Sequence, residues 1–285
     1  MNKHCEDTPD FQPEELRQAA LFWLAEPVVA RKLSGVAQLA QAWIAGNIML
    51  DVQATLLSQS TLPGQPAKPE QVMPRLVKRR SMVTAEGRAI LIHALAHIEF
   101  NAINLALDAI WRFPDMPPAY YADWLQVAKE EALHFTLLNE HLLSQGYAYG
   151  DFPAHNSLWE MADKTRGDVL ARIALVPRTL EARGLDASPA VRAKLAQVGD
   201  MAAAAILDVI LLDEIGHVGI GNRWYGWLCE QRGLEPVATY ARLAAEYKAP
   251  VMRGPFNLEA RRAAGFSELE LAALEGADAS YVAPV

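Results

Sequence analysis

The chain has 285 residues, a hydrophobic content of 52% and a formal net charge of −8. The hydrophobic content is ample for a buried core, and the acidic balance argues against a surface that coats nucleic acid. Two cysteines are too few for a disulfide framework.

The N-terminus and the apolar segments predict a cytoplasmic protein. The first residues run into acidic, proline-bearing sequence with no apolar stretch behind them, so no secretory signal is expected. The longest apolar stretch, residues 201–212, is interrupted by Asp208 and is shorter than the roughly 18 residues of a membrane span. The only basic cluster, residues 78–80, is typical of a solvated loop. We therefore expect neither a membrane nor a nucleic acid as partner.

Hydrophobic periodicity predicts an all-α chain. Apolar residues recur every three or four positions over residues 12–24 and 28–44. Residues 59–74 contain four prolines and predict a loop or linker. We divide the chain at this loop. Residues 1–75 are predicted to form an N-terminal helical appendage with a proline-rich linker, and residues 76–285 the main helical bundle with a C-terminal helical extension.

The first two bundle helices are predicted over residues 84–113 and 118–145, because prolines and a glycine mark their ends. Their short connection makes them antiparallel neighbours. With the turn midway between the two helices, Glu99 is expected level with Glu131 and His134. These last two side chains lie one helical turn apart on the same face.

The third bundle helix is predicted after a crossover of about twenty residues that contains a short helix of its own. It covers residues 165–183, although Pro177 within it removes one backbone donor. The glycine, serine and proline at 184–189 predict a break, after which the helix restarts and the chain reverses at Gly199. Glu181 is then expected just before an irregular wall, which we interpret as an entry side for a substrate or dioxygen.

The fourth bundle helix is predicted over residues 200–230. It carries Glu214 and His217, and glycines are frequent in the same stretch. A glycine inside a helix costs about 1 kcal/mol relative to alanine, so a cluster asks for a reason. Close helix packing and room for a ligand are equally good reasons, and the sequence does not choose between them. The glycines are Gly216, Gly219 and Gly221.

One pattern occurs twice along these helices: a Glu-x-x-His motif with a lone helical glutamate 32 or 33 residues before its own glutamate. A single such motif carries little information, since a surface ion pair gives the same spacing. Two copies on separate helices, with matched upstream glutamates, are the ligand set of a carboxylate-bridged dimetal site in a four-helix bundle. The predicted metal ligands are Glu99, Glu131, His134, Glu181, Glu214 and His217.

This ligand set favours iron or manganese, because such metals suit four carboxylates and two imidazoles. Burying four carboxylates without cations would be very costly, so either metals occupy the site or some of the acids are protonated. Glu130 and Asp213 precede the two motif glutamates. We expect them either to hold the imidazoles from behind or, for Glu130 in particular, to be solvated.

The remaining histidines are expected outside the metal site. His93 and His97 point about 120° and 160° away from the direction of Glu99 around the helix, which favours a packed or solvent-facing role. His141 lies about 10 Å beyond His134 along the helix, too far to bind the metals but near enough to line a cavity. Four arginines are candidates for binding an anionic substrate or for pairing with the site's carboxylates: Arg88, Arg166, Arg178 and Arg223.

Four segments carry a family resemblance: residues 175–184 (LVPRTLEARG), 96–99 (AHIE), 213–218 (DEIGHV) and 255–257 (PFN). They resemble the bacterial domain-of-unknown-function 455 family of ferritin-like proteins, and the first segment is the most specific. The resemblance implies a ferritin-like four-helix bundle with a long crossover connection, and it implies the same six ligands. A more distant similarity is to the transfer-RNA hydroxylase that oxidises an isopentenyl-adenosine side chain.

Three functional hypotheses follow. The first is a nonheme di-iron, or dimanganese, oxidoreductase such as a hydroxylase or oxidase. It would use two iron ions as cofactor, dioxygen as co-substrate, an unknown small-molecule substrate and an electron donor. The second is a ferritin-like iron-binding ferroxidase without an organic substrate. The third is a structural bundle whose metals only stabilise it. An oligomer is compatible with each, and the sequence does not name the substrate.

Overall fold

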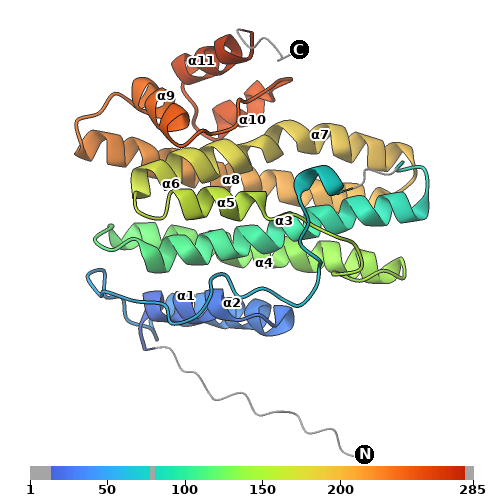
Figure 1. The fold of residues 1–285 in the computed structure, drawn as a ribbon, viewed down its shortest axis with the longest axis horizontal. Helices are drawn as coiled ribbons and strands as arrows, with labels where there is room; N and C mark the ends of the chain where they lie inside the picture. The colour runs from blue at the N-terminus through green and yellow to red at the C-terminus, as the bar shows by residue number, and fades with distance from the viewer. Residues whose placement is uncertain (1–13, 78–80, 280–285) are drawn as a thin grey trace, which may run out of the picture.

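The computed structural model describes residues 14–77 and 81–279, and within them every regular element is a helix (Figure 1). The all-α prediction is therefore confirmed, while the basic cluster at 78–80 lies outside the described residues. The elements are α1 (Leu16–Ala25), α2 (Val29–Ile44), the short 3-10 helix η1 (Pro74–Leu76), α3 (Ala85–Arg112), α4 (Pro118–Ser144), α5 (Ser157–Lys164), α6 (Val169–Leu175), the π-helical η2 (Val176–Glu181), α7 (Ala182–Gln197), α8 (Met201–Gln231), α9 (Pro236–Glu246), α10 (Leu258–Ala263) and α11 (Glu268–Ala279).

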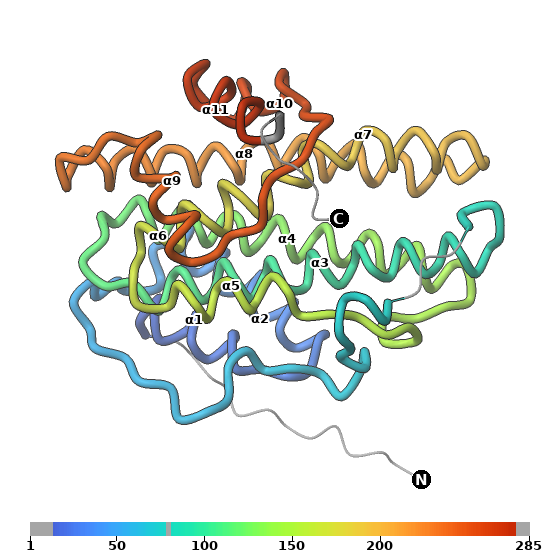
Figure 2. Tube along the Cα trace, turned by 45° about the horizontal axis from the view of Figure 1, so that its top comes forward, coloured from blue at the N-terminus to red at the C-terminus, as the bar shows by residue number. Residues whose placement is uncertain are grey.

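The helices are arranged in layers (Figures 1 and 2). The antiparallel pair α3 and α4 lies in the middle, with α1 and α2 on one side and α6, α7 and α8 on the other. The helices α9, α10 and α11 lie beyond α6 to α8, on the face that points away from α3 and α4. One hydrophobic cluster extends from Leu16 in α1 to Leu243 in α9. The proposed division of the chain at residue 75 stays a prediction.

The ends of α3 and α4 follow the local signals in the sequence. The hydroxyl of Thr84 accepts a hydrogen bond from the backbone N–H of Gly87, which caps the first turn of α3. Pro118 occupies the first turn of α4, where its missing N–H removes no helical hydrogen bond. Because both ends lie where predicted, Glu99 on α3 and the pair on α4 reach the same level of the molecule.

The predicted break at residues 184–189 is wrong, because α7 runs through Gly184 and Pro189 without interruption. Pro189 cannot donate to the carbonyl of Leu185, four residues before it. The side-chain amide of Asn257 donates to that carbonyl instead, at 3.2 Å. A residue far along the chain thus supplies the missing donor, and the helix continues.

The irregularity lies earlier, in the π-helical segment η2, which begins beside Pro177. The widened turn is consistent with the donor that Pro177 lacks. The hydroxyl of Thr179 donates to the carbonyl of Ala174 at 2.8 Å, which ties the segment to the end of α6. Glu181 is the last residue of η2, so it lies at the end of the irregular segment rather than before one.

The chain reverses at Gly199, as predicted, with a φ of +85° that favours glycine. The glycines of α8 have different surroundings. A Cβ at Gly221 would lie 2.9 Å from Cβ of Pro177, which supports the packing interpretation at this position. Gly216 is exposed and faces open space. Close packing therefore explains Gly221 but not Gly216.

One described helix, α3, is long and apolar enough to cross a membrane. Its apolar window is longer than the 201–212 stretch singled out from the sequence. However, 72% of that window is buried inside the protein, which is typical of the core helix of a soluble protein. The cytoplasmic location stays a prediction.

Candidate metal centre

Four helical elements bring the six predicted residues together in the interior. Ligand-type atoms of four of them, Glu99, Glu131, His134 and Glu214, all lie within 4.8 Å of one another, and all four residues are buried. We call the full set of six the Glu/His cluster. Its members are Glu99 on α3, Glu131 and His134 on α4, Glu181 at the end of η2, and Glu214 and His217 on α8.

Glu131 occupies the centre of the cluster, between the two imidazoles. Its Oε2 lies 3.3 Å from Nδ1 of His134, and its Oε1 lies 3.0 Å from Nδ1 of His217. Nδ1 of His134 is also 3.6 Å from Oε2 of Glu99, and Nδ1 of His217 is 3.8 Å from Oε1 of Glu214. Both Nδ1 atoms therefore point inward, toward the carboxylates.

Glu181 joins the cluster from the η2 side. Its Oε2 is buried and has no hydrogen-bond partner among the described residues. Burial, together with the charges of Glu214 and Glu131, raises the pKa of Glu181 to about 8. The sequence prediction that this glutamate lies with the two motifs is therefore consistent with the structure.

The acid before each motif glutamate contacts the histidine of the other motif. Nε2 of His134 lies 3.0 Å from Oδ2 of Asp213, and Nε2 of His217 lies 2.8 Å from Oε2 of Glu130. Glu130 is thus more than a solvated acid. A carboxylate that accepts from the outer imidazole N–H leaves the inner nitrogen available as a ligand.

Burial and mutual contacts shift the pKa values of the residues in the Glu/His cluster strongly. Burial and the charge of Glu131 raise the pKa of Glu99 well above its usual range, and they also raise that of Glu214. Burial would raise the pKa of Glu131 too, but the facing His217 and His134 lower it. Burial disfavours the charged form of His134, yet the neighbouring carboxylates of Glu131 and Glu99 raise its pKa to about 11. Without bound cations, bound protons must balance the negative charge of the four carboxylates.

Several buried polar atoms of the cluster lack hydrogen-bond partners among the described residues. A buried polar atom without a partner is costly, and in native proteins it calls for an explanation. Two divalent cations would satisfy these atoms and would balance four carboxylates and two neutral imidazoles, so the residues fit a metal site. The atoms are Oε2 of Glu99, Oε2 of Glu181 and Oε2 of Glu214.

His93 and His97 pack against the crossover instead of joining the cluster. Nε2 of His93 accepts from the backbone N–H of Gly150 at 2.9 Å, and Nδ1 of His97 lies 2.8 Å from the hydroxyl of Tyr149. Burial lowers the pKa of both histidines to about 4, so both are neutral at neutral pH. The packed role that helical geometry favoured is confirmed.

The other candidates pair elsewhere. Nε2 of His141 contacts Asp200, the residue that caps α8, at 3.1 Å. Nothing in the sequence indicated that the buried Asp108 and Arg172 pair with each other, because local spacing does not show contacts between distant helices. The four candidate arginines bind other acids: Arg88 contacts Asp200, Arg166 contacts Asp163, Arg178 contacts Glu270, and Arg223 contacts Asp123.

Comparison with known proteins places the chain in a family. A model of the family described as protein of unknown function (DUF455) matches residues 25–272. The chain is also 50% identical, over 231 residues, to a protein from Haemophilus influenzae that is described as uncharacterized. That match covers 79% of this chain and 80% of the relative. No solved structure matches the chain. Since the family model covers most of its length, the chain belongs to the DUF455 family of proteins of unknown function.

Proposed function

We propose that this protein is a carboxylate-bridged nonheme di-iron protein and that it acts as an oxygen-dependent oxidoreductase on a small substrate. In this proposal α3, α4, the α6 to α7 segment and α8 form a ferritin-like four-helix bundle around the metals. The observation that carries the proposal is the set of buried carboxylate oxygens without partners, which face two imidazoles held from behind by acids.

The Glu/His cluster would hold the two metal ions. Glu131 lies between both inward imidazole nitrogens, so it would be the central carboxylate ligand of the pair. When bound, a di-iron pair reduces dioxygen and so supplies the oxidising power for attack on a substrate. Manganese suits the same ligands. An external electron donor would then be a partner of the protein.

The chain's own residues would position and shield the site. Asp213 and Glu130 fix the orientation of His134 and His217 through their outer nitrogens. The burial of the cluster excludes water and strengthens each electrostatic contact. Glu181, at the end of the π-helical segment, would be the ligand with the least regular backbone support.

Anaerobic titration with ferrous iron, followed by addition of oxygen, tests this function. We expect about two irons per chain and oxygen consumption that continues only when a reductant is supplied. The Glu131→Ala variant should lose bound iron, whereas Glu140→Ala, an exposed acid on the same helix, should not. Many irons per chain would instead favour a ferritin-like ferroxidase. Equal iron content in wild type and Glu131→Ala, at background level, would remove both metal functions.

A further inference from the structure

A cavity of about 370 Å³ lies between α9, α11 and η2. Figures 1 and 2 show that α9 to α11 lie on the face of α6 to α8 that points away from α3 and α4, and residues of α9, α11 and η2 line the cavity. Its volume is within the range of small-molecule sites. No residue of the Glu/His cluster lines it.

The walls of the cavity are largely apolar. Both helices present alanines toward it, so the space between them is wide enough for a ligand rather than filled by side chains. Larger apolar side chains make up the rest of its apolar lining. The principal apolar residues are Val237, Tyr240, Met252, Phe266 and Leu274.

Two buried arginines line the same cavity. The side chains of Arg178 and Arg261 are 3% and 2% exposed. Their guanidinium carbons lie 5.1 Å and 5.3 Å from the centre of the Phe266 ring, so the two groups flank one aromatic side chain. Both guanidinium groups therefore lie against the same aromatic side chain, which itself lines the cavity.

The contacts of both guanidinium groups within the described residues use Nε and Nη2. Nε and Nη2 of Arg178 donate to Asn222 and Glu270. Nε and Nη2 of Arg261 donate to Asp186, and Nη2 also donates to the carbonyl of Ala182. No contact within the described part of the chain uses Nη1 of either arginine.

We propose that this cavity binds a small amphipathic carboxylate. Its apolar body would lie between α9 and α11, and its carboxylate would accept charge-assisted hydrogen bonds from Nη1 of Arg178 and Nη1 of Arg261. Arg178 is paired with Glu270 and Arg261 with Asp186, so the two Nη1 donors, rather than an excess of positive charge, would hold the anion. This site is additional to the proposed function and does not depend on it, because no metal is needed.

Calorimetric titration of the full-length protein with decanoate tests the proposal, with decan-1-ol and decyltrimethylammonium as probes of equal chain length. We expect saturable binding of one decanoate per chain. The alcohol and the cation should bind at least about tenfold more weakly, because they lack the anionic acceptor. Glu270→Gln should tighten decanoate binding without affecting the alcohol, which a merely apolar groove would not do.

Substitutions that fill the cavity with a larger side chain test whether decanoate binds there. Ala273→Phe on α11 enters the cavity and should weaken decanoate binding at least about tenfold. Ala272→Phe, on the next residue and outside the lining, should leave it unchanged. If circular dichroism shows that Ala273→Phe is unfolded, Ala245→Phe enters from α9, with Ala238→Phe as its control. Absence of saturable decanoate binding, equal binding of the cation, or full binding to the folded filled variants would overturn the proposal.

Discussion

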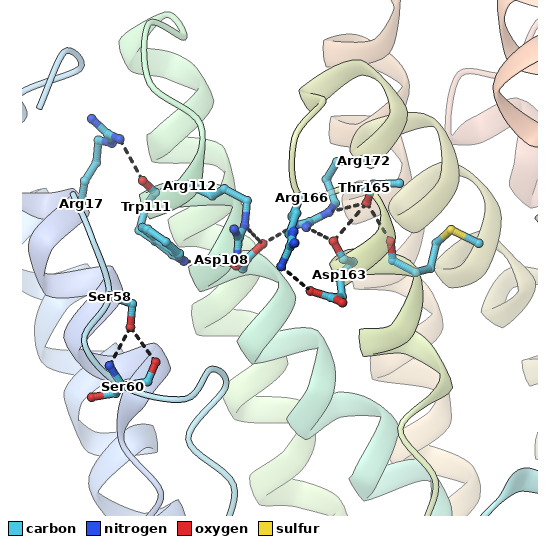
Figure 3. A network of polar contacts seen from close by, with 12 residues as sticks. Arg17, Ser58, Ser60, Asp108, Trp111, Arg112, Asp163, Thr165, Arg166 and Arg172 are labelled. Carbon is cyan, nitrogen blue, oxygen red and sulfur yellow. Dashed lines mark hydrogen bonds and ion pairs between the residues drawn. The ribbon is translucent and has the colours of Figure 1, made fainter. Parts of the chain in front are cut away.

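Two networks of buried polar side chains lie in the core of this protein, and their acids are partnered in different ways. The first is the Asp108 network (Figure 3). Asp108 on α3 accepts from Nε of Arg112 at 2.9 Å and from Nε1 of Trp111 at 3.1 Å, and it also pairs with Arg172. Nε of Arg172 in turn donates to the hydroxyl of Thr165 at 2.9 Å. Protein groups thus partner both oxygens of this acid.

The Glu/His cluster is the second, and it begins on the same helix with Glu99. Here four acids share two imidazoles, and several of their oxygens have no partner among the described residues. Burial would raise the pKa of Asp108, but Arg172 and Arg112 lower it, whereas burial raises that of Glu99. A buried carboxylate needs a positive charge beside it. Arg112 and Arg172 supply that charge to Asp108, whereas no contact among the described residues pairs an arginine with the Glu/His cluster. In the Glu/His cluster, a metal ion would supply the positive charge that arginines supply to Asp108.

The largest expected effect comes from breaking the satisfied cluster. Asp108→Asn keeps the shape but leaves Arg172 as a buried charge with no carboxylate, which should lower the free energy of unfolding by about 3–5 kcal/mol. Urea denaturation measures this loss. Asp163→Asn, an exposed acid paired with Arg166, should cost less than about 1 kcal/mol. Iron content of the folded Asp108→Asn protein should not change. If both variants lose the same stability, the Asp108 network is not held by its charges.

The second effect concerns the acids behind the imidazoles. Asp213→Asn removes the charged acceptor of Nε2 of His134, and we expect metal affinity to fall about 10- to 100-fold. Competition with a chelator measures the affinity. Asp208→Asn, an acid of α8 that pairs with Arg192 at the surface, is the matched control and should retain wild-type affinity. Equal affinities would mean that the outer contact does not orient the ligand.

Local spacing in the sequence was enough to predict the level at which the glutamates of the Glu/His cluster lie along their helices. Helix ends at prolines, caps and glycines set the level of Glu99, Glu131 and Glu214, because a regular helix converts residue number into height. The course of η2 and α7 could not be predicted this way, since the donor that preserves α7 at Pro189 comes from Asn257.

The pairing of buried side chains was also beyond local spacing. Glu130 and His217 are in contact although they lie on different helices and 87 residues apart in the sequence. The only local sign of this contact is an acid next to each motif glutamate. Tertiary contacts decide which acid meets which imidazole, and they likewise bring Arg172 to Asp108.

Lys32 extends the comparison to a buried amine whose hydrogen-bond acceptors, among the described residues, are all neutral. Its Nζ lies 3.3 Å from the carbonyl oxygens of Leu24 and Gly64 and also donates to Asn104. Burial lowers the pKa of Lys32 from 10.5 to about 7, although Glu26 opposes this.

The expected consequence is a pH dependence of stability. Between about pH 7 and pH 10.5 the unfolded chain keeps a proton on Lys32 that the folded chain has lost. Lys32 therefore contributes a rise of the free energy of unfolding with pH, by at most about 1.4 kcal/mol per unit, that levels off below about pH 7, so the slope of the wild type should exceed that of a Lys32 variant by this amount. Lys32→Met should remove this rise. Urea denaturation at several pH values measures both slopes, and identical slopes would contradict the shifted pKa.

The smallest expected effect is the direct counterpart of Asp108→Asn. Glu181→Gln makes the same carboxylate-to-amide change in the Glu/His cluster, where Oε2 has no hydrogen bond to lose. The metal-free protein should therefore change in unfolding free energy by less than about 1 kcal/mol. Metal affinity should fall by at least about tenfold, because a neutral amide replaces an anionic ligand. Urea denaturation with and without iron separates the two results. A large loss in the metal-free protein would show that protein contacts already satisfy Glu181, and the need for a cation at this acid would disappear.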